Sequence, residues 1–312
     1  MVSLRQIRSF VAVYEEGSFT AAAAREGATQ SGMSQHVRQL EESLGVTLFE
    51  RSGRAVTPTV AGKSYYVDCV AILKRLDLAT RRIETTTQAG SGRVRIGLMP
   101  TFTRGALPPV LQRFTELAPG AEIKILEAYS GVLTSMVRAG ELDFAIVPGF
   151  EGAVGLSSSL LARDREMLVS AKGRTGRHLQ PVRLADAGPL KIVVPGPDNT
   201  RRNTQDAYIA THGVTIARRL ELDAMLGTLE FVAETDWVAI LPSMLVFDDR
   251  GGERYEIRPL AGPALYADFV FIEPARQSLS PLAQLFADLM RQQTEAIEAQ
   301  WDAHLARVPV PA

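Results

Sequence analysis

The sequence predicts an α+β protein of several domains: a helical N-terminal domain, one long helix, and a C-terminal α/β domain of two subdomains. Three observations lead to this prediction. The chain has 312 residues, which suits two or three domains. Its first part carries hydrophobic residues at helical spacing, whereas short apolar strands alternate with helices further on. Between the two patterns, residues 89–92 read Ala-Gly-Ser-Gly, a flexible-linker composition.

The first predicted helix runs from about Leu4 to Glu15 and is expected to lie in the core of the N-terminal domain. Gly17 ends this helix, and Ser18 is the expected N-cap of a second one. The second helix is rich in alanine, which allows two helices to cross closely, as in a helix-turn-helix. The apolar stripe of the first helix consists of Leu4, Ile7, Phe10, Val11 and Tyr14.

The stretch from Thr29 to Gly45 is predicted to be the helix that contacts another molecule. Met33, Val37 and Leu40 recur on one face, and Leu44 continues the same stripe. The opposite face carries short hydrogen-bonding side chains and one arginine, which suits a helix in a DNA major groove. The alternative is a polar face that is only solvated. The candidate DNA contacts on this helix are Thr29, Gln30, Ser31, Ser34, Gln35 and Arg38.

A basic hairpin is predicted directly after this helix. In LFERSGRAVTPT, two extended arms surround Ser52 and Gly53, and Arg51 and Arg54 flank the tip. These two arginines are further candidate DNA contacts. Two crossed helices followed by a basic wing are typical of a winged helix-turn-helix DNA-binding domain, which we assign to residues 1–58.

Residues 59–89 are predicted to form one long linker and dimerisation helix with Thr59 as its N-cap. It would be about 40 Å long. Its apolar residues follow a spacing that a coiled coil uses, so a second copy of the chain is the expected partner. The alternative is packing against its own domain. The predicted seam consists of Tyr65, Cys69, Ile72, Leu76, Ala79 and Ile83.

Residues 90–312 are predicted to form a C-terminal domain around a parallel α/β sheet. Its first half has strands at RVRIGLM, AEIKILEA and LDFAIVPG, with helices over 103–117 and 130–139. Its second half has strands at LKIVVPG, ARRLEL and WVAILP, with helices over 201–212 and 225–234. The last strand and the helix from Ser280 return to the first half. Subdomain I then spans about 93–163 and 270–305, and subdomain II about 168–262.

Candidate ligand contacts in this domain lie mostly at helix starts. In open α/β sheets, ligands bind beyond the carboxyl ends of strands, often at helix N-termini. Hydroxyl groups there suit a small anion, and Arg201 with Arg202 could balance an organic carboxylate. The alternative is that the hydroxyls cap helices, the arginines are solvated and Trp237 packs in the core. The candidate effector-binding residues are Thr101, Phe102, Thr103, Ser130, Asn199, Thr200 and Trp237.

The stretch TQSGMSQHVRQLEESLGVTLFERSGR, followed by TPTVAG, resembles the winged helix-turn-helix of LysR-type transcriptional regulators. Gly32 and Pro58 depart from the family pattern, which usually has Ala and Leu there. The resemblance implies an effector domain like a periplasmic binding protein, with Thr101 and Ser130 at ligand-contacting positions. It also implies a linker helix that pairs antiparallel between subunits. Expected partners are double-stranded promoter DNA, RNA polymerase, a small-molecule effector and further copies of the chain as a dimer of dimers.

The composition of the chain restricts how it can bind DNA, where it can be located and which sites its cysteine can form. The net charge is −1, so DNA affinity must come from how charges are placed and from several copies binding together. No window approaches the roughly 18 apolar residues of a membrane span, and the N-terminus does not read as a signal peptide, so a cytoplasmic location is expected. The single cysteine, Cys69, excludes an intrachain disulfide and a cysteine-based metal site.

We expect neither an enzymatic function nor a bound metal or other cofactor. The sequence contains no GxSxG elbow, P-loop, HExxH or GxGxxG motif. The four histidines, His36, His178, His212 and His304, are far apart and share no motif. The rival hypothesis is a solute-binding or sensor protein whose N-terminal domain serves assembly only. The favoured function is a sequence-specific transcriptional regulator whose activity responds to a small molecule bound between the two subdomains.

Overall fold

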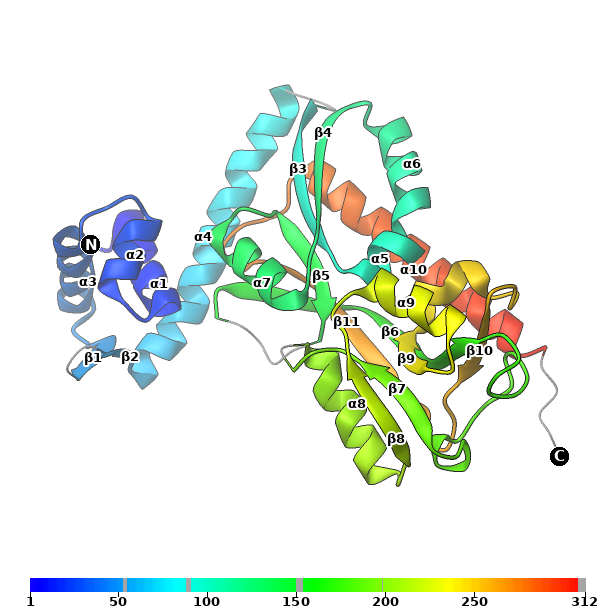
Figure 1. Ribbon diagram of the computed structural model, residues 1–312. Coiled ribbons are helices and arrows are strands. Elements are labelled where there is room, and N and C mark those ends of the chain that lie inside the picture. Colours follow the sequence, from blue (N-terminus) through cyan, green and yellow to red (C-terminus); the bar gives the residue numbers. More distant parts are fainter. Residues whose placement is uncertain (53–54, 88–90, 150–153, 198, 308–312) are drawn as a thin grey trace. The chain divides into compact units, whose positions relative to one another are not determined.

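The computed structural model describes residues 1–52, 55–87, 91–149, 154–197 and 199–307 (Figure 1). The chain forms two compact units. The first, which we call the DNA-binding unit, comprises Met1–Ala89 together with the short segments Gly152–Ser157 and Glu273–Ser278. The second, which we call the effector unit, comprises the remainder. Among the described residues, no helix has the length and apolar character that crossing a bilayer requires.

The DNA-binding unit contains the three predicted short helices, the hairpin and the long helix. Ser3 caps the first helix in a reciprocal capping box with Gln6, and Gly17 ends it with positive φ, which glycine adopts without steric cost. Ser18 caps the second helix as predicted. The elements are α1 (Leu4–Glu16), α2 (Phe19–Arg25), α3 (Gln30–Leu44), β1 (Phe49–Ser52), β2 (Ala55–Pro58) and α4 (Val60–Thr87).

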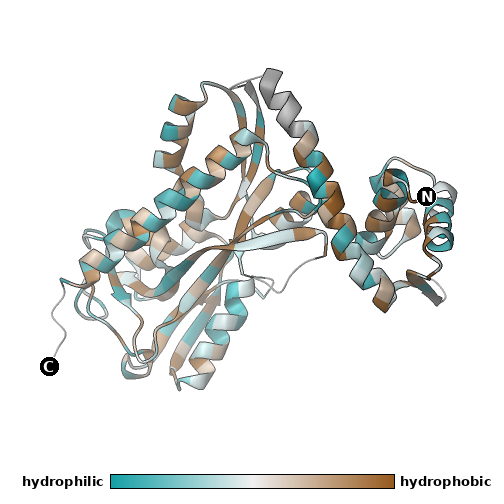
Figure 2. Cartoon of the chain, turned by 180° about the vertical axis from the view of Figure 1, so that it is seen from behind, coloured by the Kyte–Doolittle hydropathy of each residue, from teal (hydrophilic) through white to brown (hydrophobic). Residues whose placement is uncertain are grey.

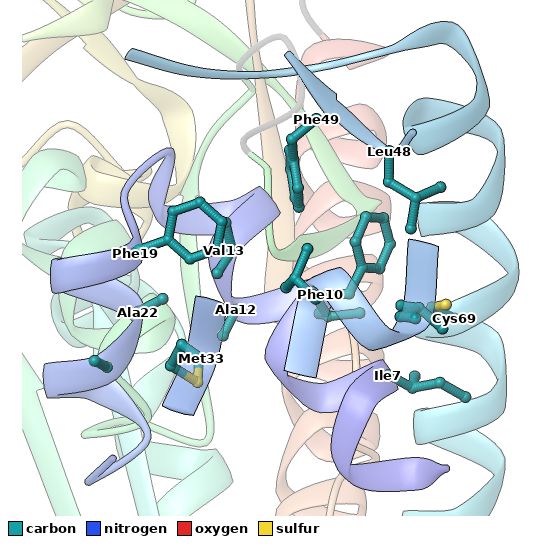
Figure 3. Packing of buried hydrophobic residues seen from close by; sticks show 14 of the residues in the cluster. Ile7, Phe10, Ala12, Val13, Phe19, Ala22, Met33, Leu48, Phe49 and Cys69 are labelled. Carbon is teal, nitrogen blue, oxygen red and sulfur yellow. The ribbon is translucent and has the colours of Figure 1, made fainter. Parts of the chain in front are cut away.

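The core of this unit forms around Phe10 of α1 (Figure 3). The Phe10 ring lies 5.3 Å from the ring of Phe49 and 5.5 Å from that of Tyr65. The α3 stripe of Met33, Val37 and Leu40 is buried as predicted. Leu4 was expected in the core but is 44% exposed, because it stands at the first helical position of α1, beyond the contact with the other helices.

Helix α4 begins in this core, which corrects part of the predicted seam. Cys69 and Leu73 are fully or nearly buried among the residues of α1, α3 and β1, and Tyr65 packs against them. These positions therefore serve the chain's own domain. Burial also raises the pKa of the Cys69 thiol to about 11, so this cysteine is a core residue rather than a reactive one. Ile72, by contrast, is exposed.

A second apolar stripe on α4 faces away from that core. Val60 and Val67 are seven residues apart, and Leu78 follows eleven residues later, so the three lie on one side of the helix. Val67 is 66% exposed and Val60 is also exposed. Figure 2 shows that hydrophobic positions recur along the coloured part of α4.

The effector unit is built on one sheet in the order β4-β3-β5-β11-β6-β9-β7-β8, with β10 paired to β6. Helix α10 packs against α6 and η2, α7 against β5, and α9 against β9. The elements are β3 (Ser91–Leu98), α5 (Pro100–Gly105), α6 (Leu107–Leu117), β4 (Gly120–Glu127), α7 (Ser130–Ala139), β5 (Phe144–Pro148), β6 (Leu156–Ala171), η1 (Leu184–Asp186), β7 (Leu190–Val194), α8 (Thr200–Thr211), β8 (Ile216–Glu221), α9 (Met225–Glu234), β9 (Val238–Pro242), η2 (Ser243–Asp249), β10 (Tyr255–Pro259), β11 (Tyr266–Pro274) and α10 (Pro281–Leu305).

The sheet is mixed, whereas the sequence analysis predicted a parallel one. β3 pairs parallel with β4 and β5, and β7 pairs parallel with β8 and β9. The long strands break this pattern: β11 runs antiparallel to β5, and β6 runs antiparallel to β9 and β10. β6 and β11 are also neighbours and so join the two parallel groups.

The predicted helix over 103–117 is two helices, α5 and α6. Pro108 and Pro109 lack backbone N–H groups and therefore start α6 rather than continue α5. Helix α5 also lies tightly on η2: a Cβ atom added at Gly105 would stand 2.2 Å from the Met244 carbonyl oxygen. This close approach requires glycine at position 105.

A buried carboxyl group, Asp164 of β6, holds the start of η2. It accepts hydrogen bonds from the Ser243 hydroxyl at 2.5 Å and from the Met244 backbone N–H at 3.1 Å. Burial raises the pKa of Asp164 to about 7, although both hydrogen bonds act in the opposite direction. The neighbouring Glu166 and Glu298 raise this pKa further.

We expect Asp164 to make stability depend on pH. The pKa is about 7 in the folded chain and about 4 in the unfolded chain, so the folded state holds the proton more tightly. The free energy of unfolding should therefore fall by about 1.4 kcal/mol per pH unit as pH rises from about 4 to about 7, and stay level above. Asp164→Asn has no such proton. Urea unfolding of both proteins between pH 5 and 8.5 measures the difference; a wild-type-minus-variant difference that is constant over this range contradicts the assignment.

Candidate DNA interface and effector site

The polar edge of α3 is presented to solvent. Thr29 is the N-cap, and its hydroxyl accepts a hydrogen bond from the Gly32 backbone N–H at 3.2 Å. Gln30, Ser31 and Gln35 are exposed, whereas Ser34 is half-buried. The opposite face is anchored in the core, so this edge is held on a rigid support.

Arg38 extends from the middle of this edge. Its side chain is 77% exposed and its Nε donates to the Glu42 carboxylate at 3.0 Å. Ion pairs this exposed, between residues four apart on a helix, contribute only about 0.3–0.5 kcal/mol. Such a weak pair leaves Arg38 available to a phosphate or a guanine.

The hairpin predicted as the wing is an antiparallel pair of β1 and β2, in which Arg51 stands opposite Val56. The Arg51 side chain and the whole of Arg54 lie outside the described residues. Glu41 of α3 ties the hairpin to the helix, because its carboxylate accepts from the backbone N–H groups of Leu48 at 2.7 Å and Phe49 at 3.2 Å. The sequence analysis missed this role of Glu41; its place three residues after Arg38 marked it only as one charge among several.

The hydroxyls predicted as effector contacts have different environments. Thr101 is buried, and its Oγ1 has no hydrogen-bond partner among the described residues. The Thr103 hydroxyl donates to the Glu127 carboxylate, and its oxygen also lies 3.2 Å from the Pro100 carbonyl oxygen. Phe102 is fully buried with its ring 5.0 Å from that of Phe269, which makes it part of the core.

Of the remaining candidates, Asn199 and Thr200 line two different cavities, whereas Ser130 lines neither of them. Tyr129, the N-cap residue before Ser130, shares a small cavity of about 20 Å³ with Asn199 and Met225. Thr200 lines a larger cavity of about 230 Å³. Trp237 lines neither of these: its ring packs 5.8 Å from that of Phe231, and Arg218 lies over it at 5.5 Å.

The larger cavity lies where α8 meets β6 and β11. Its lining residues are Pro148, Gly149, Arg163, Glu166, Thr200, Arg201, Thr204, Gln205, Tyr266, Ala267 and Asp268. Glu166, Gln205 and Tyr266 were not predicted. The signal for Glu166 was present in LARDREMLVS, where charged residues interrupt a strand that is otherwise largely buried.

The two arginines proposed to balance a carboxylate ligand already have carboxylate partners, which corrects that expectation. Arg201 is buried and binds both oxygens of Glu166, at 2.9 and 2.7 Å. Arg202 binds Asp206 at 2.5 Å, Glu221 at 3.4 Å and the Pro195 carbonyl at 2.7 Å. Neither arginine is merely solvated, and neither is left unpaired for an anion.

The sequence matches two known protein families along most of its length. Residues 4–63 match the family described as "Bacterial regulatory helix-turn-helix protein, lysR family", and residues 87–295 match the "LysR substrate binding domain". The nitrogen assimilation regulatory protein nac of Escherichia coli K12 is 27% identical over 290 residues, which cover 93% of this chain and 94% of that protein. The HTH-type transcriptional regulator IlvR of Caulobacter vibrioides is 32% identical over 259 residues, which cover 81% and 87%.

Solved structures share the fold. Full-length BenM superposes with a TM-score of 0.55 at 22% identity, covering 95% of this chain and 98% of that one. The LysR-family regulator CbnR in complex with its target DNA superposes with a TM-score of 0.53 at 21% identity, covering 94% and 99%. Both predictions, of the family and of the fold, are confirmed. The chain belongs to the LysR family of DNA-binding transcriptional regulators, which carry an effector-binding domain and are not enzymes.

Proposed function

We propose that this regulator binds promoter DNA as a homo-oligomer in the cytoplasm, contacts RNA polymerase there, and responds to a small molecule bound in the effector unit. The observation that carries the proposal is the exposed polar edge of α3, held on a packed core beside the β1–β2 hairpin. A helix of this kind fits the major groove, and a hairpin next to it reaches the backbone. The proposed contacts are Thr29, Gln30, Ser31, Ser34, Gln35, Arg38, Arg51 and Arg54.

Self-association supplies the DNA affinity that a single copy of the chain lacks. The net charge of −1 provides little general attraction for DNA. Two linked copies reading two half-sites gain affinity without further contacts within each copy. The outward stripe of α4, with Val60 and Val67, is the surface we assign to the pairing of two chains. A dimer of such dimers then engages further half-sites.

The effector is proposed to bind where the two groups of parallel strands meet. The larger cavity, which Thr200 lines, supports this site. We propose Thr101, whose hydroxyl has no partner among the described residues, and Ser130 and Asn199, at the starts of α7 and α8, as further contacts, although none of the three lines that cavity. We place Phe102 and Trp237 in the packing around it.

Transmission to the DNA-binding unit is proposed to run through the outer ends of β6 and β11. The Tyr66 hydroxyl donates to Glu15 at 3.0 Å and accepts from the Gly155 backbone N–H at 3.1 Å, directly before β6. After β11, Asp77 accepts from the Ser278 backbone N–H at 2.8 Å. Lys74 of α4 binds Glu273 at 2.8 Å. Helix α4 thus holds the segments at both strand ends.

Replacing Arg38 by Ala should weaken binding to the DNA upstream of the protein's own gene by about tenfold, because a base or phosphate contact is worth roughly 1–3 kcal/mol. Ser34→Ala should weaken it less. Gel-shift titration measures both, with Arg113→Ala, an exposed arginine of the effector unit, as control. Melting temperatures should match those of the wild type. Wild-type affinity in Arg38→Ala removes Arg38 from the interface.

Val67→Glu should disrupt the oligomer, because it places a charge on the outward stripe of α4. Sedimentation velocity should show a shift toward smaller species at the same concentration. Arg113→Glu, which changes the charge by two on another surface, is the control. An unchanged oligomer in Val67→Glu would assign the pairing surface to another part of the chain.

Tyr66→Phe should release the strand end at Gly155. Without the hydroxyl, the Gly155 N–H loses its acceptor, so peptides covering residues 154–157 should exchange amide hydrogens faster. Stability should fall by about 1–2 kcal/mol, since the hydroxyl also donates to a carboxylate. Tyr65→Phe is the matched control: it removes a hydroxyl from the same helix that bonds Cys69. Equal exchange in the two variants contradicts the proposed role of Tyr66.

A further inference from the structure

Strands β7, β8 and β9 begin at an edge of the sheet that carries several cations and a tryptophan. We call the surface formed there by Lys172, Arg174, Arg177, Arg218 and Trp237 the basic edge. We propose that the basic edge docks an acidic segment of a protein partner, which brings carboxylates to the cations and an apolar side chain to the tryptophan. The inference goes beyond the proposed function, because neither DNA nor the effector is proposed to bind on this surface.

The sheet topology brings these residues to one edge. β7, β8 and β9 run parallel and therefore begin at the same edge, whereas β6 runs antiparallel to β9 and ends there at Ala171. Arg218 lies near the start of β8, and Trp237 directly precedes β9. The turn over residues 172–177 directly follows β6. Since neighbouring strands lie about 4.8 Å apart, the order β6-β9-β7-β8 gives the edge a length of about 14 Å.

Four cations of the basic edge are exposed and have no carboxylate partner among the described residues. They are Lys172, Arg174, Arg177 and Arg218. The neighbouring Lys191, by contrast, binds Asp236 at 2.5 Å. The hydrogen bond from Lys191 lowers the pKa of the Asp236 carboxyl, and the charge of Arg174 adds to this effect, so Arg174 lies within electrostatic reach of the start of β9. Unpaired cations gathered in this way attract an anionic partner.

The turn that carries three of these cations is held in place by buried side chains of β10. Arg258 is 9% exposed and donates to the carbonyl groups of Gln180, at 3.0 Å, and Thr175. The Glu256 carboxylate accepts from the Thr175 backbone N–H at 3.1 Å and from its hydroxyl at 2.5 Å. A Cβ atom added at Gly176 would stand 2.6 Å from the Arg258 guanidinium. The backbone of the turn is thus already ordered, which lowers the entropy cost of binding a partner.

Trp237 adds an aromatic anchor beside the cations. Its ring lies 5.8 Å from the ring of Phe231, and the Arg218 guanidinium lies over it at 5.5 Å from the centroid. The residue is half-buried, so part of it stays at the surface. A guanidinium stacked on a ring keeps its N–H groups for a carboxylate. Tryptophan and arginine are also the residues that most often contribute the binding energy of protein interfaces.

The carboxylates beside the basic edge favour a protein over DNA. The Asp236 side chain is 47% exposed, and Glu234 is exposed nearby in the sequence. A phosphate backbone is negative throughout and would meet both carboxylates. A protein segment can place a neutral or positive residue against them and its own carboxylates against the cations. An extended segment of about four residues covers the length of the edge.

A titration of the full-length protein with a synthetic peptide tests the proposal. The probe is a short fluorescein-labelled peptide of glutamates around one leucine, and the matched control peptide has glutamine in place of each glutamate. Fluorescence anisotropy should show saturable binding of the acidic peptide and binding of the control peptide that is about tenfold weaker. Equal affinity for the two peptides, or no binding of the acidic one, overturns the proposal.

Variants locate the bound peptide. Arg174→Glu and Arg218→Glu, toward the two ends of the basic edge, should each weaken its affinity about tenfold, because each turns an attraction into a repulsion. Arg113→Glu, at an exposed position of α6, is the control and should bind as the wild type does. The chain has two tryptophans, and Trp301 is buried, so unlabelled peptide should change the tryptophan emission of the wild type but not of Trp237→Phe. Wild-type affinity in both edge variants overturns the assignment.

Two further measurements on Arg174→Glu and Arg218→Glu separate a protein partner from the other occupants. Gel-shifts with the upstream DNA should match those of the wild type; a loss of DNA affinity as large as the loss of peptide affinity would assign the edge to DNA. Sedimentation velocity should also match, whereas a shift to smaller species would assign the edge to the pairing of two copies of this chain. Either of these losses overturns the proposal.

Discussion

The buried ion pair between Glu166 and Arg201 is the interaction on which the effector unit depends. It fixes the first turn of α8 to the long strand β6, and Arg201 also donates to the Ile240 carbonyl of β9 at 3.0 Å. Two charges this deeply buried persist only as a pair, because removing one partner leaves the other uncompensated at a cost of about 3–5 kcal/mol. The same pairing occupies the Arg201 guanidinium, so Arg201 is not left unpaired for an anion. One set of contacts therefore joins α8 to two strands of the sheet.

In the DNA-binding unit, helix α4 takes part in several contacts at once. Its first turns complete the core around Phe10, its outward side carries exposed Val60 and Val67, and its middle holds the segments next to β6 and β11. Because interiors are close-packed, a shift of α4 must be followed by the helices packed on it. A change in how two copies pair, or in where the strand ends lie, is therefore felt at α3, the helix that we assign to the DNA groove.

The parts that could be predicted from the sequence are those determined by local patterns. The periodicity of Met33, Val37 and Leu40 predicted which face of α3 is buried, and the extended runs in LFERSGRAVTPT predicted the strands β1 and β2. Contacts between distant residues could not be predicted: Arg201 and Glu166 are 35 positions apart, and nothing near Arg201 shows that a carboxylate of β6 lies against it. The seam on α4 was ambiguous for a physical reason, since Tyr65 and Cys69 have the spacing of a coiled coil and also of a helix packed on its own domain. Likewise, alternation of strands and helices predicts parallel pairs but not the antiparallel β6 and β11.

Strand β6 belongs to both units, because its first residues lie in the DNA-binding unit and its later residues line the cavity of the effector unit. Gly155, whose backbone N–H donates to the Tyr66 hydroxyl, directly precedes β6, and Glu166 of the cavity lining belongs to that strand. A ligand alters the DNA-binding unit only if it binds two arrangements of that strand with different affinity. The ion pair beneath stays intact in either arrangement, since breaking it would cost more than one new hydrogen bond returns. We therefore expect β6 and α8 to move together as one body.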